Sequence, residues 1–379
     1  MERCEGVGLT CDFLRQDRIS AKNGTHVGDA QLCRQMVAQA LEVEPAALQI
    51  DRFDRSPSKL TLRSRGQVKA KRFFAKTYLV DSYPIESRFV AAWDLGEPRE
   101  EARRPVEKQI EVEWSMTRRM GELAGCMEVP QPIGKSAAAR TIVWEEAAGR
   151  RVDRMVRRSA WADPRGKSIV PVVSRAGAWL ARVHRASAGE RRTLDLAQVR
   201  SSLHRLLHER GLDASRYGVV ARRVFEDALA EVGSTVLEVP IVFTHGDFNN
   251  ANLIWDEETQ RLGVVDFELA GYQDIPRDLV TFLFNLRIQM LNPLISPTLV
   301  RALEDAFWEG YGAVPRPLYA FVTGVTAASV FYYYLPRVAN RRRRRGRWAG
   351  LMASLYKTLF ESSVVTRRLG IPRELWEGN

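Results

Sequence analysis

Apolar and polar residues alternate in several short runs of the first part of the chain, a pattern typical of half-buried β-strands. Three of these runs, 48–53, 59–65 and 71–80, are joined by the segments DRSPSK and GQVKA, which are typical of hairpin turns. A fourth run begins at RTIVWEE and breaks at Gly149. We therefore expect an antiparallel sheet in this part of the chain.

Two segments near these strands show the spacing of an amphipathic helix instead. Apolar residues recur every three or four positions in 29–43, and a similar pattern fills 107–125 up to its closing glycine. The segment 81–107 is polar, contains proline and carries both signs of charge, so we expect a loop or an insertion there. From Gly149 onward the pattern is mostly helical.

One stretch of the second half departs from the helical pattern and reads as strand, loop, strand, turn and strand. It begins with FTHGDFNNANLIWD, and NLIWDEETQRLGVVDFE places a polar turn between two apolar runs, as a β-hairpin does. In a hairpin of this register, Asn252 and Asp266 lie at the same end of the two paired strands.

These patterns predict an α+β fold with two lobes. We expect an N-terminal helical extension over 1–46, a sheet-containing lobe over 47–149 that ends in a hinge, and a mainly helical lobe over 150–379. A chain of 379 residues is long enough to give each lobe its own core.

The composition is that of a globular protein, with 45% hydrophobic and 27% charged residues. The four cysteines form no CxxC pair and no dense framework, which fits free thiols in a reducing compartment. The first residues, MERCEGVGLTCDFLRQDR, contain no apolar signal region. We therefore expect a cytoplasmic protein.

The net charge of +11 is concentrated in the middle of the chain. Residues 150–239 contain 18 Lys and Arg against 10 Asp and Glu, an excess of +8. A basic face attracts phosphate groups on nucleic acids, on lipids or on acidic glycans. A solvated, arginine-rich helix surface is the alternative reading of the same excess.

The residues with the clearest chemistry are Asp247, Asn252 and Asp266. Two oxygen-bearing side chains at one end of a hairpin suit Mg²⁺, which prefers a few hard oxygen ligands and keeps water and phosphate oxygens for the rest. A carboxylate in the preceding loop can orient a hydroxyl nucleophile and accept its proton during phosphoryl transfer. We assign Asn252 and Asp266 to the metal and Asp247 to the acceptor hydroxyl.

The motif H-G-D-x-x-x-x-N, followed by an apolar strand and D-F-E, resembles that of the aminoglycoside phosphotransferase and choline kinase family. The resemblance implies a bilobal protein-kinase-like fold that uses ATP and Mg²⁺. It places the catalytic base on Asp247 and a structural histidine on His245. The segment GYQDIPRDLVTFL is similar to the family's D-x-x-x-D-L, whose second aspartate braces the catalytic loop and falls on Asp278, and GAWLARVHRA is similar to the helix that ends in L-x-x-x-H.

The same resemblance implies a lysine for the ATP phosphates and a helical glutamate that holds it. Lys76 lies in an apolar strand, where an unpaired ammonium is costly, and is the best candidate. Glu111 and Glu113 are both possible partners, and Glu113 is preferred because it shares a helix face with methionines. TIVWEEAAG is then the hinge, with backbone groups near Glu145 and Ala147 on the adenine edge.

One feature departs from the kinase pattern. The turn RSPSK between the first two strands has no glycine, which would let backbone amides close on phosphates, so Ser56, Ser58 and Lys59 would cover them instead. A non-catalytic protein that keeps the fold and binds a partner through its basic surface is therefore an alternative. A protein kinase is another, although the loop has Gly246 where protein kinases have arginine and no APE-like element follows Asp266.

The run 318–335 contains no charge and reaches the lower length limit for a membrane span, but a buried core helix is the preferred reading. The five arginines at 341–345 and the amphipathic segment 347–364 leave peripheral membrane contact open. We expect a small-molecule or glycan acceptor and no specific nucleic acid. The acceptor itself, the choice of ATP or GTP and the oligomeric state are not determined by the sequence.

Overall fold

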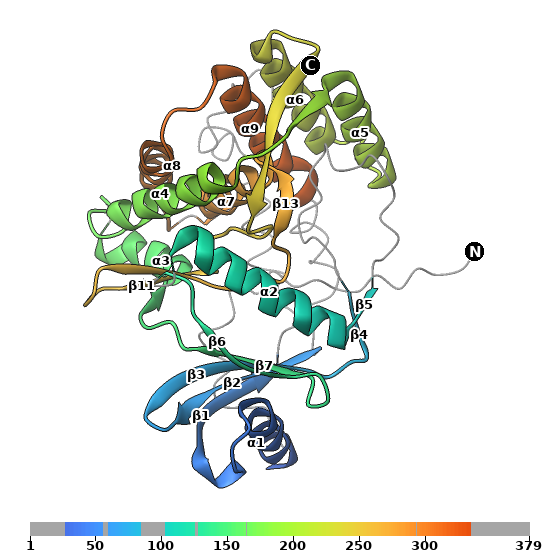
Figure 1. Ribbon diagram of the computed structural model, residues 1–379. Helices are drawn as coiled ribbons and strands as arrows, with labels where there is room; N and C mark the ends of the chain where they lie inside the picture. Colours follow the sequence, from blue (N-terminus) through green and yellow to red (C-terminus); the bar gives the residue numbers. More distant parts are fainter. Residues whose placement is uncertain are drawn as a thin grey trace, which may run out of the picture. The chain divides into compact units, whose positions relative to one another are not determined.

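The computed structural model describes residues 27–55, 60–84, 103–125, 128–163, 165–292 and 294–334. The chain divides into two compact units, the first formed by Met1–Glu86 and Glu100–Ala147, the second by Ser87–Arg99 and Ala148–Asn379. Figure 1 labels the elements of both units, which are described separately below.

Unit 1 is built on a five-stranded antiparallel sheet with the strand order β1-β2-β3-β7-β6. Its strands and helices are α1 Val27–Leu41, β1 Leu48–Arg55, β2 Thr61–Val68, β3 Lys71–Tyr78, β4 Ser82–Pro84, β5 Arg103–Pro105, α2 Val106–Ala124, β6 Pro132–Ser136 and β7 Thr141–Glu145, with a short 3₁₀ turn at Pro45–Ala47. The antiparallel sheet and the two helices that the sequence predicted are confirmed, with ends that differ by a few residues. Strand β6 was not predicted. The segment 81–107 was expected to be a loop, but its two ends form β4 and β5, which pair with each other and are too short, at three residues each, to show an alternating pattern.

The alternation of side chains along β3 assigns its residues to two faces of the sheet. Phe73 and Ala75 belong to a core cluster that also contains residues of α1. Phe74 and Tyr78 belong to a second cluster with residues of α2, so Lys76, which alternates with them, lies on the α2 face. Figure 1 shows α1 and α2 on opposite sides of the sheet.

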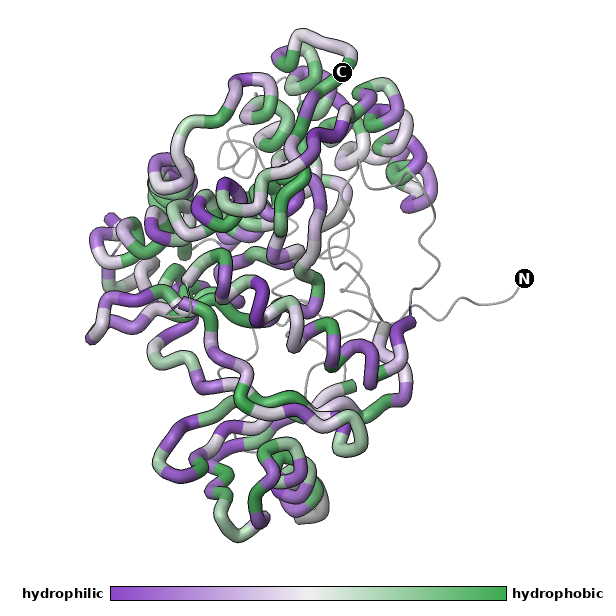
Figure 2. The backbone as a smooth tube through the Cα atoms, viewed as in Figure 1, coloured by the Kyte–Doolittle hydropathy of each residue, from purple (hydrophilic) through white to green (hydrophobic). Residues whose placement is uncertain are grey.

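Unit 2 is mainly helical. Its elements are β8 Arg150–Arg151, α3 Val152–Ala162, α4 Val170–Ser187, β9 Arg191–Asp195, α5 Leu196–Glu209, α6 Arg216–Val232, β10 Val236–Thr244, β11 Leu253–Asp256, β12 Arg261–Val264, β13 Gly271–Asp274, α7 Pro276–Arg287, α8 Pro297–Tyr311 and α9 Arg316–Ser329, with a 3₁₀ turn at Ile288–Leu291 and a π-helical turn at Val330–Tyr334. Its helices carry bands of hydrophobic and hydrophilic residues, as amphipathic helices do (Figure 2).

Two three-stranded sheets interrupt the helices of unit 2. Strands β11 and β12 form the predicted hairpin, and β8 pairs with β11 on the other side. Strand β10 lies between β9 and β13. Strands β8, β9 and β13 were not predicted. In β9 the reason is physical: only Leu194 of RRTLD is buried, so the strand shows no apolar alternation.

Helices α4 and α8 pack closely because glycines lie at their crossing. A β-carbon on Gly177 would lie 2.2 Å from the carbonyl oxygen of Phe307, and one on Gly310 would lie 1.9 Å from that of Ser174. Any larger residue at either position would push the two helices apart. This approach brings the last two turns of α8 against Ser174 and Gly177 of α4.

Several sequence-based expectations concern parts of the chain that the structure does not describe. Ser56, Ser58 and Lys59, the arginine run 341–345 and the segment 347–364 lie outside the described residues. Within the described residues, α9 and the turn that follows it contain most of the uncharged run 318–335. Nine residues of α9 are buried, as expected for a core helix. None of the helices described here has both the length and the apolar character needed to cross a membrane.

Candidate active site

The loop after β10 contains a glycine that no other residue could replace without a clash. Gly246 has φ +79°, and a β-carbon there would lie 2.1 Å from the carbonyl oxygen of Leu269. The backbone of the loop therefore passes directly beside the segment that follows Asp266. This contact requires glycine between His245 and Asp247, which explains the middle letter of the H-G-D motif.

The side chain of Asp278, in the first turn of α7, binds backbone amides of the same loop. The amide of His245 donates to Oδ2 at 2.7 Å, and the amide of Gly246 donates to Oδ1 at 2.9 Å. Burial alone would raise the pKa of the Asp278 carboxyl, but the hydrogen bonds that it accepts from His184 and from the amide of His245 help to hold this pKa below its usual value. The carboxylate thus remains ionised and fixes the two residues that precede Asp247.

Asp247 is partly exposed, whereas the two asparagines that bind it are buried. The side-chain nitrogen of Asn252 donates to the backbone oxygen of Asp247 at 3.0 Å and to its Oδ2 at 3.3 Å. Asn249 donates to the same backbone oxygen at 2.9 Å. The loop therefore closes on itself around Asp247, and its shape depends on both asparagines.

Asn252 and Asp266 lie at the same end of the β11–β12 hairpin, as the sequence predicted. Leu253 is paired with Val264, and the amide of Val265 donates to the carbonyl oxygen of Asn252 at 3.0 Å. Asp266 follows with φ +74°, a conformation that costs a residue with a β-carbon about 1–3 kcal/mol. A strained conformation persists only where the surrounding structure holds it in place, and such conformations are frequent at functional sites.

The donor set at this end of the hairpin fits Mg²⁺. Because the amide nitrogen of Asn252 faces Asp247, its Oδ1 is the atom left to act as a ligand. A carboxylate on Asp266 adds a second hard oxygen, and a site with few protein ligands is what Mg²⁺ accepts when phosphate and water complete its shell. Among the described residues there is no cluster of three or more His, Cys, Asp or Glu with metal-binding geometry.

His245 acts within the loop rather than at its surface. Its Nε2 lies 3.0 Å from the carbonyl oxygen of Val265, and its ring packs against Phe248 and Phe267. Because Val265 precedes Asp266, this contact ties the loop of Asp247 to the end of the hairpin. The structure therefore brings His245, Asp247, Asn252, Asp266 and Asp278 together in unit 2.

In unit 1, Lys76 and Glu113 form an ion pair that is removed from solvent. The ammonium nitrogen lies 3.3 Å from each carboxylate oxygen, and the side chains are 4% and 2% exposed. Glu111, the other glutamate that the sequence left open, instead contacts Lys135 at the surface. A buried pair of this kind is costly to form and strongly destabilising to break, so its presence calls for a role besides stability.

Two tyrosines that sequence reasoning missed complete the surroundings of Lys76. Its ammonium lies 5.3 Å from the centre of the Tyr78 ring and 5.6 Å from that of Tyr83, which is within the range of cation–π attraction. The Tyr78 hydroxyl also donates to Glu113. The signal for Tyr78 was available, because a residue two positions from Lys76 lies on the same face of the strand.

The predicted hinge residues lie at the end of β7. The amide of Glu145 donates to the carbonyl oxygen of Gln131 at 2.9 Å, and the amide of Glu146 donates to that of Arg72 at 3.1 Å. Among the described residues, none accepts a hydrogen bond from the amide of Ala147. Ala147 is also the last residue of unit 1.

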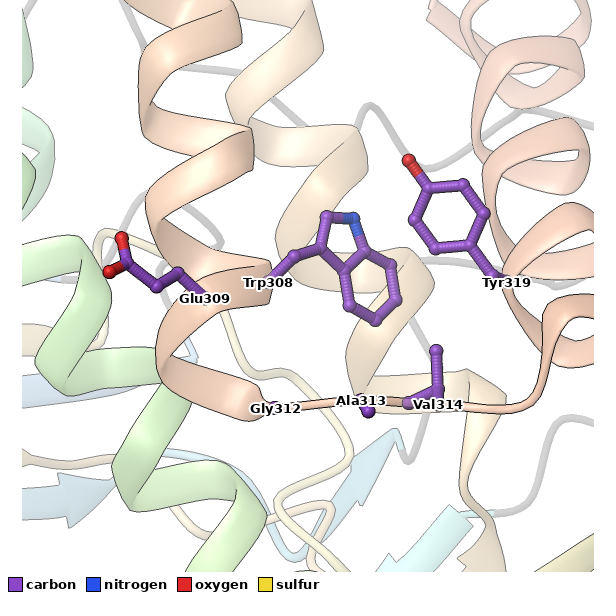
Figure 3. Close-up of a pocket in the computed structure, with 6 residues that line it drawn as sticks. All are labelled: Trp308, Glu309, Gly312, Ala313, Val314 and Tyr319. Atoms are coloured by element: carbon purple, nitrogen blue, oxygen red, sulfur yellow. The ribbon is translucent and has the colours of Figure 1, made fainter.

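An open pocket of about 400 Å³ lies between α8 and α9. In Figure 3 the rings of Trp308 and Tyr319 lie next to each other above the loop of Gly312, Ala313 and Val314, with an angle of 54° between their planes, and the Glu309 carboxylate points away from them. None of the residues predicted from the sequence lines this pocket, so we do not assign the chemistry to it.

A sequence profile described as the phosphotransferase enzyme family matches residues 87–322. No curated protein matches the chain. Among solved structures, a macrolide 2'-phosphotransferase from Brachybacterium faecium is 16% identical, with 86% of this chain and 96% of that chain covered and a TM-score of 0.48. An aminoglycoside phosphotransferase from Alicyclobacillus acidocaldarius is 14% identical, with coverage of 88% and 92% and a TM-score of 0.47. A choline kinase from Streptococcus pneumoniae is 11% identical, with coverage of 90% and 99% and a TM-score of 0.43.

Proposed function

Because the chain belongs to the phosphotransferase enzyme family, we propose that it transfers the γ-phosphate of ATP, with Mg²⁺, to a hydroxyl group of a small molecule or glycan. The profile match confirms the family that the loop motif indicated, and with it the kinase-like fold class. The identity of the acceptor and the roles of individual residues are the parts that we propose.

The observation that carries the proposal is the closed loop around Asp247. Asn252 donates to both the backbone and the carboxylate of Asp247, while Asp278 holds the preceding two amides. A carboxylate fixed in this way can accept the proton of an attacking hydroxyl with little reorganisation. A binding protein without catalysis would have no need for this arrangement.

Each remaining residue has a role that its surroundings support. Lys76, oriented by Glu113, would bind the nucleotide phosphates, and the backbone around Glu145 and Ala147 would bind the adenine edge. Oδ1 of Asn252 and the carboxylate of Asp266 would hold Mg²⁺. When bound, that ion would neutralise the charge on the phosphates as the hydroxyl attacks. His245 and Asp278 would keep the loop in shape.

The charges after the hinge favour a neutral or anionic acceptor. Residues 150–239 carry an excess of +8, and two of the acidic side chains there, those of Asp153 and Glu226, are held by arginines. Asp153 accepts from Arg151 at 3.0 Å and from Arg157 at 2.7 Å, and Glu226 accepts from Arg200 at 2.8 Å. A polycationic acceptor would need free carboxylates to bury its ammonium groups. We therefore expect sugars, sugar phosphates or envelope glycans to be better acceptors than aminoglycosides or choline.

The experiment that tests this proposal is a phosphorylation assay with Mg²⁺, ATP and a panel of acceptors. The panel compares neutral sugars and sugar phosphates with kanamycin-type amines and choline at equal concentration. We expect Mg²⁺-dependent phosphorylation of a neutral or anionic member. Turnover of the amines alone would contradict the acceptor class. The absence of nucleotide binding, measured separately by calorimetry, would contradict the kinase assignment itself and favour a non-catalytic binding protein.

A further inference from the structure

A line of buried polar contacts connects α8 to the loop that contains Asp247. The hydroxyl of Tyr311, the last residue of α8, lies 2.9 Å from Nδ1 of His184 in α4. Nε2 of His184 lies 3.3 Å from Oδ2 of Asp278. The three residues are 5%, 1% and 0% exposed, so water does not compete for these contacts.

The chemistry of the partners gives these contacts a direction. Asp278 is ionised and can only accept, so the proton of His184 that faces it lies on Nε2. Nδ1 then accepts a hydrogen bond from Tyr311, whose phenol stays protonated because burial raises its pKa. The hydrogen bond that one ring nitrogen makes decides which tautomer a histidine adopts. Tyr311 therefore keeps the donor of His184 directed at Asp278.

We propose that Tyr311 is a positioning residue for phosphoryl transfer, acting through His184 and Asp278 on the backbone of the loop that contains Asp247. This inference rests on the proposed function of that loop. From the described residues Asp278 receives three donors: Nε2 of His184 and the amides of His245 and Gly246. Without the hydrogen bond from His184, the Asp278 carboxylate would keep only its contacts with the two loop amides, and its own position would be less well fixed.

The way in which α8 meets α4 supports a positioning role rather than ordinary packing. Arg185, the neighbour of His184, donates to the backbone oxygen of Tyr311 at 2.8 Å. The glycines at Gly177 and Gly310 allow the close approach of the two helices. Tyr311, at the end of α8, is thus held through both its backbone oxygen and its side chain. Its hydroxyl, the one polar atom of the side chain, contacts His184, which in turn contacts Asp278.

The test compares Tyr311→Phe with Tyr272→Phe. Both variants remove one hydroxyl, and in Tyr311→Phe the ring keeps its contacts with Phe307 and Trp308. Tyr272 is 57% exposed and serves as the matched control. Thermal unfolding first verifies that both variants fold. Amide hydrogen exchange at His245 and Gly246 and the kinetics of phosphoryl transfer are then measured.

We expect Tyr311→Phe to speed exchange of both amides and to lower kcat about 3- to 10-fold, the size of one lost hydrogen bond, with little change in KM for ATP. Tyr272→Phe should match the wild type. Unchanged exchange in Tyr311→Phe would overturn the inference, and so would faster exchange with an unchanged kcat. If the wild-type protein shows no phosphoryl transfer, the proposed function fails, and the exchange rates still decide whether Tyr311 holds the loop.

Discussion

The ammonium of Lys76 lies 3.3 Å from both carboxylate oxygens of Glu113, across 37 positions of sequence and inside the core of unit 1. Strand β3 supplies the lysine on the face that packs against α2, and α2 supplies the glutamate from its buried side. The alternation of side chains along β3 places Lys76 on this face, and the helical period of α2 places Glu113 opposite it. The glutamate holds the lysine ammonium in one position, where the ammonium can also bind an anionic ligand.

Replacing Glu113 by glutamine should be strongly destabilising, because the ammonium of Lys76 would remain buried opposite a neutral group. We expect the free energy of unfolding to fall by about 3 kcal/mol and the affinity for ATP to weaken. Urea unfolding and calorimetry measure the two effects. Glu111→Gln is the control, since its exposed contact with Lys135 should change stability by no more than about 0.5 kcal/mol. Equal effects of the two substitutions would contradict the assignment.

Gly246→Ala should disable the loop through a clash as well as through strain. The positive φ alone costs alanine about 1–2 kcal/mol, and the new methyl group would also collide with the carbonyl of Leu269. Gly233→Ala has a similar φ of +68° with no atom within 4 Å, so it isolates the strain. We expect the first variant to lose more stability than the second and to lose phosphoryl transfer. Similar unfolding free energies for the two would show that the loop can move aside.

Asp278→Asn should alter the dependence of stability on pH. The pKa of Asp278 is lower in the folded protein than in the unfolded chain, so its contribution is complete above the unfolded pKa and is lost as pH falls through the folded pKa. The wild type should therefore lose stability as pH falls below about 4, the unfolded value for aspartate. The variant should be less stable at neutral pH and should lack this part of the acid dependence. Parallel stability curves for the two proteins would contradict the account.

Asp266→Ala should weaken binding of the Mg²⁺–nucleotide complex more than binding of the nucleotide alone. We expect a loss of about tenfold in affinity for a non-hydrolysable ATP analogue with Mg²⁺, measured by calorimetry. Asp256→Ala at the other end of the same hairpin is the control, because Asp256 only caps the turn through Thr259 and Glu258. A loss of the same size with Mg²⁺ and with EDTA would remove the metal role of Asp266.

The sequence predicted the parts of the fold that depend on local patterns. Strands β1, β2, β3 and β7 and the β11–β12 hairpin have turn residues or apolar alternation of their own, so they could be predicted. Strand β9 could not, because its one buried residue, Leu194, gives no pattern and the strand exists only through pairing with β10. The pairing of β9 with β10 is determined by the tertiary structure and not by a local pattern.

The same distinction applies to the candidate site. Asp247, Asn252 and Asp266 are close in sequence, and a hairpin alone is enough to bring the last two together. Tyr311 is 127 positions from His184, and only the packing of α8 on α4 joins them. No local signal in the sequence indicates this contact, since a tyrosine at the end of an amphipathic helix is ordinarily a core residue.

The most direct test of the central claim is the effect of Asp247→Asn on phosphoryl transfer, followed by ³¹P NMR with Mg²⁺, ATP and the best acceptor of the panel. We expect kcat to fall by about two to four orders of magnitude, as the loss of a general base does, while unfolding free energy and ATP affinity stay close to those of the wild type. Wild-type turnover by a folded, ATP-binding Asp247→Asn variant would contradict the account.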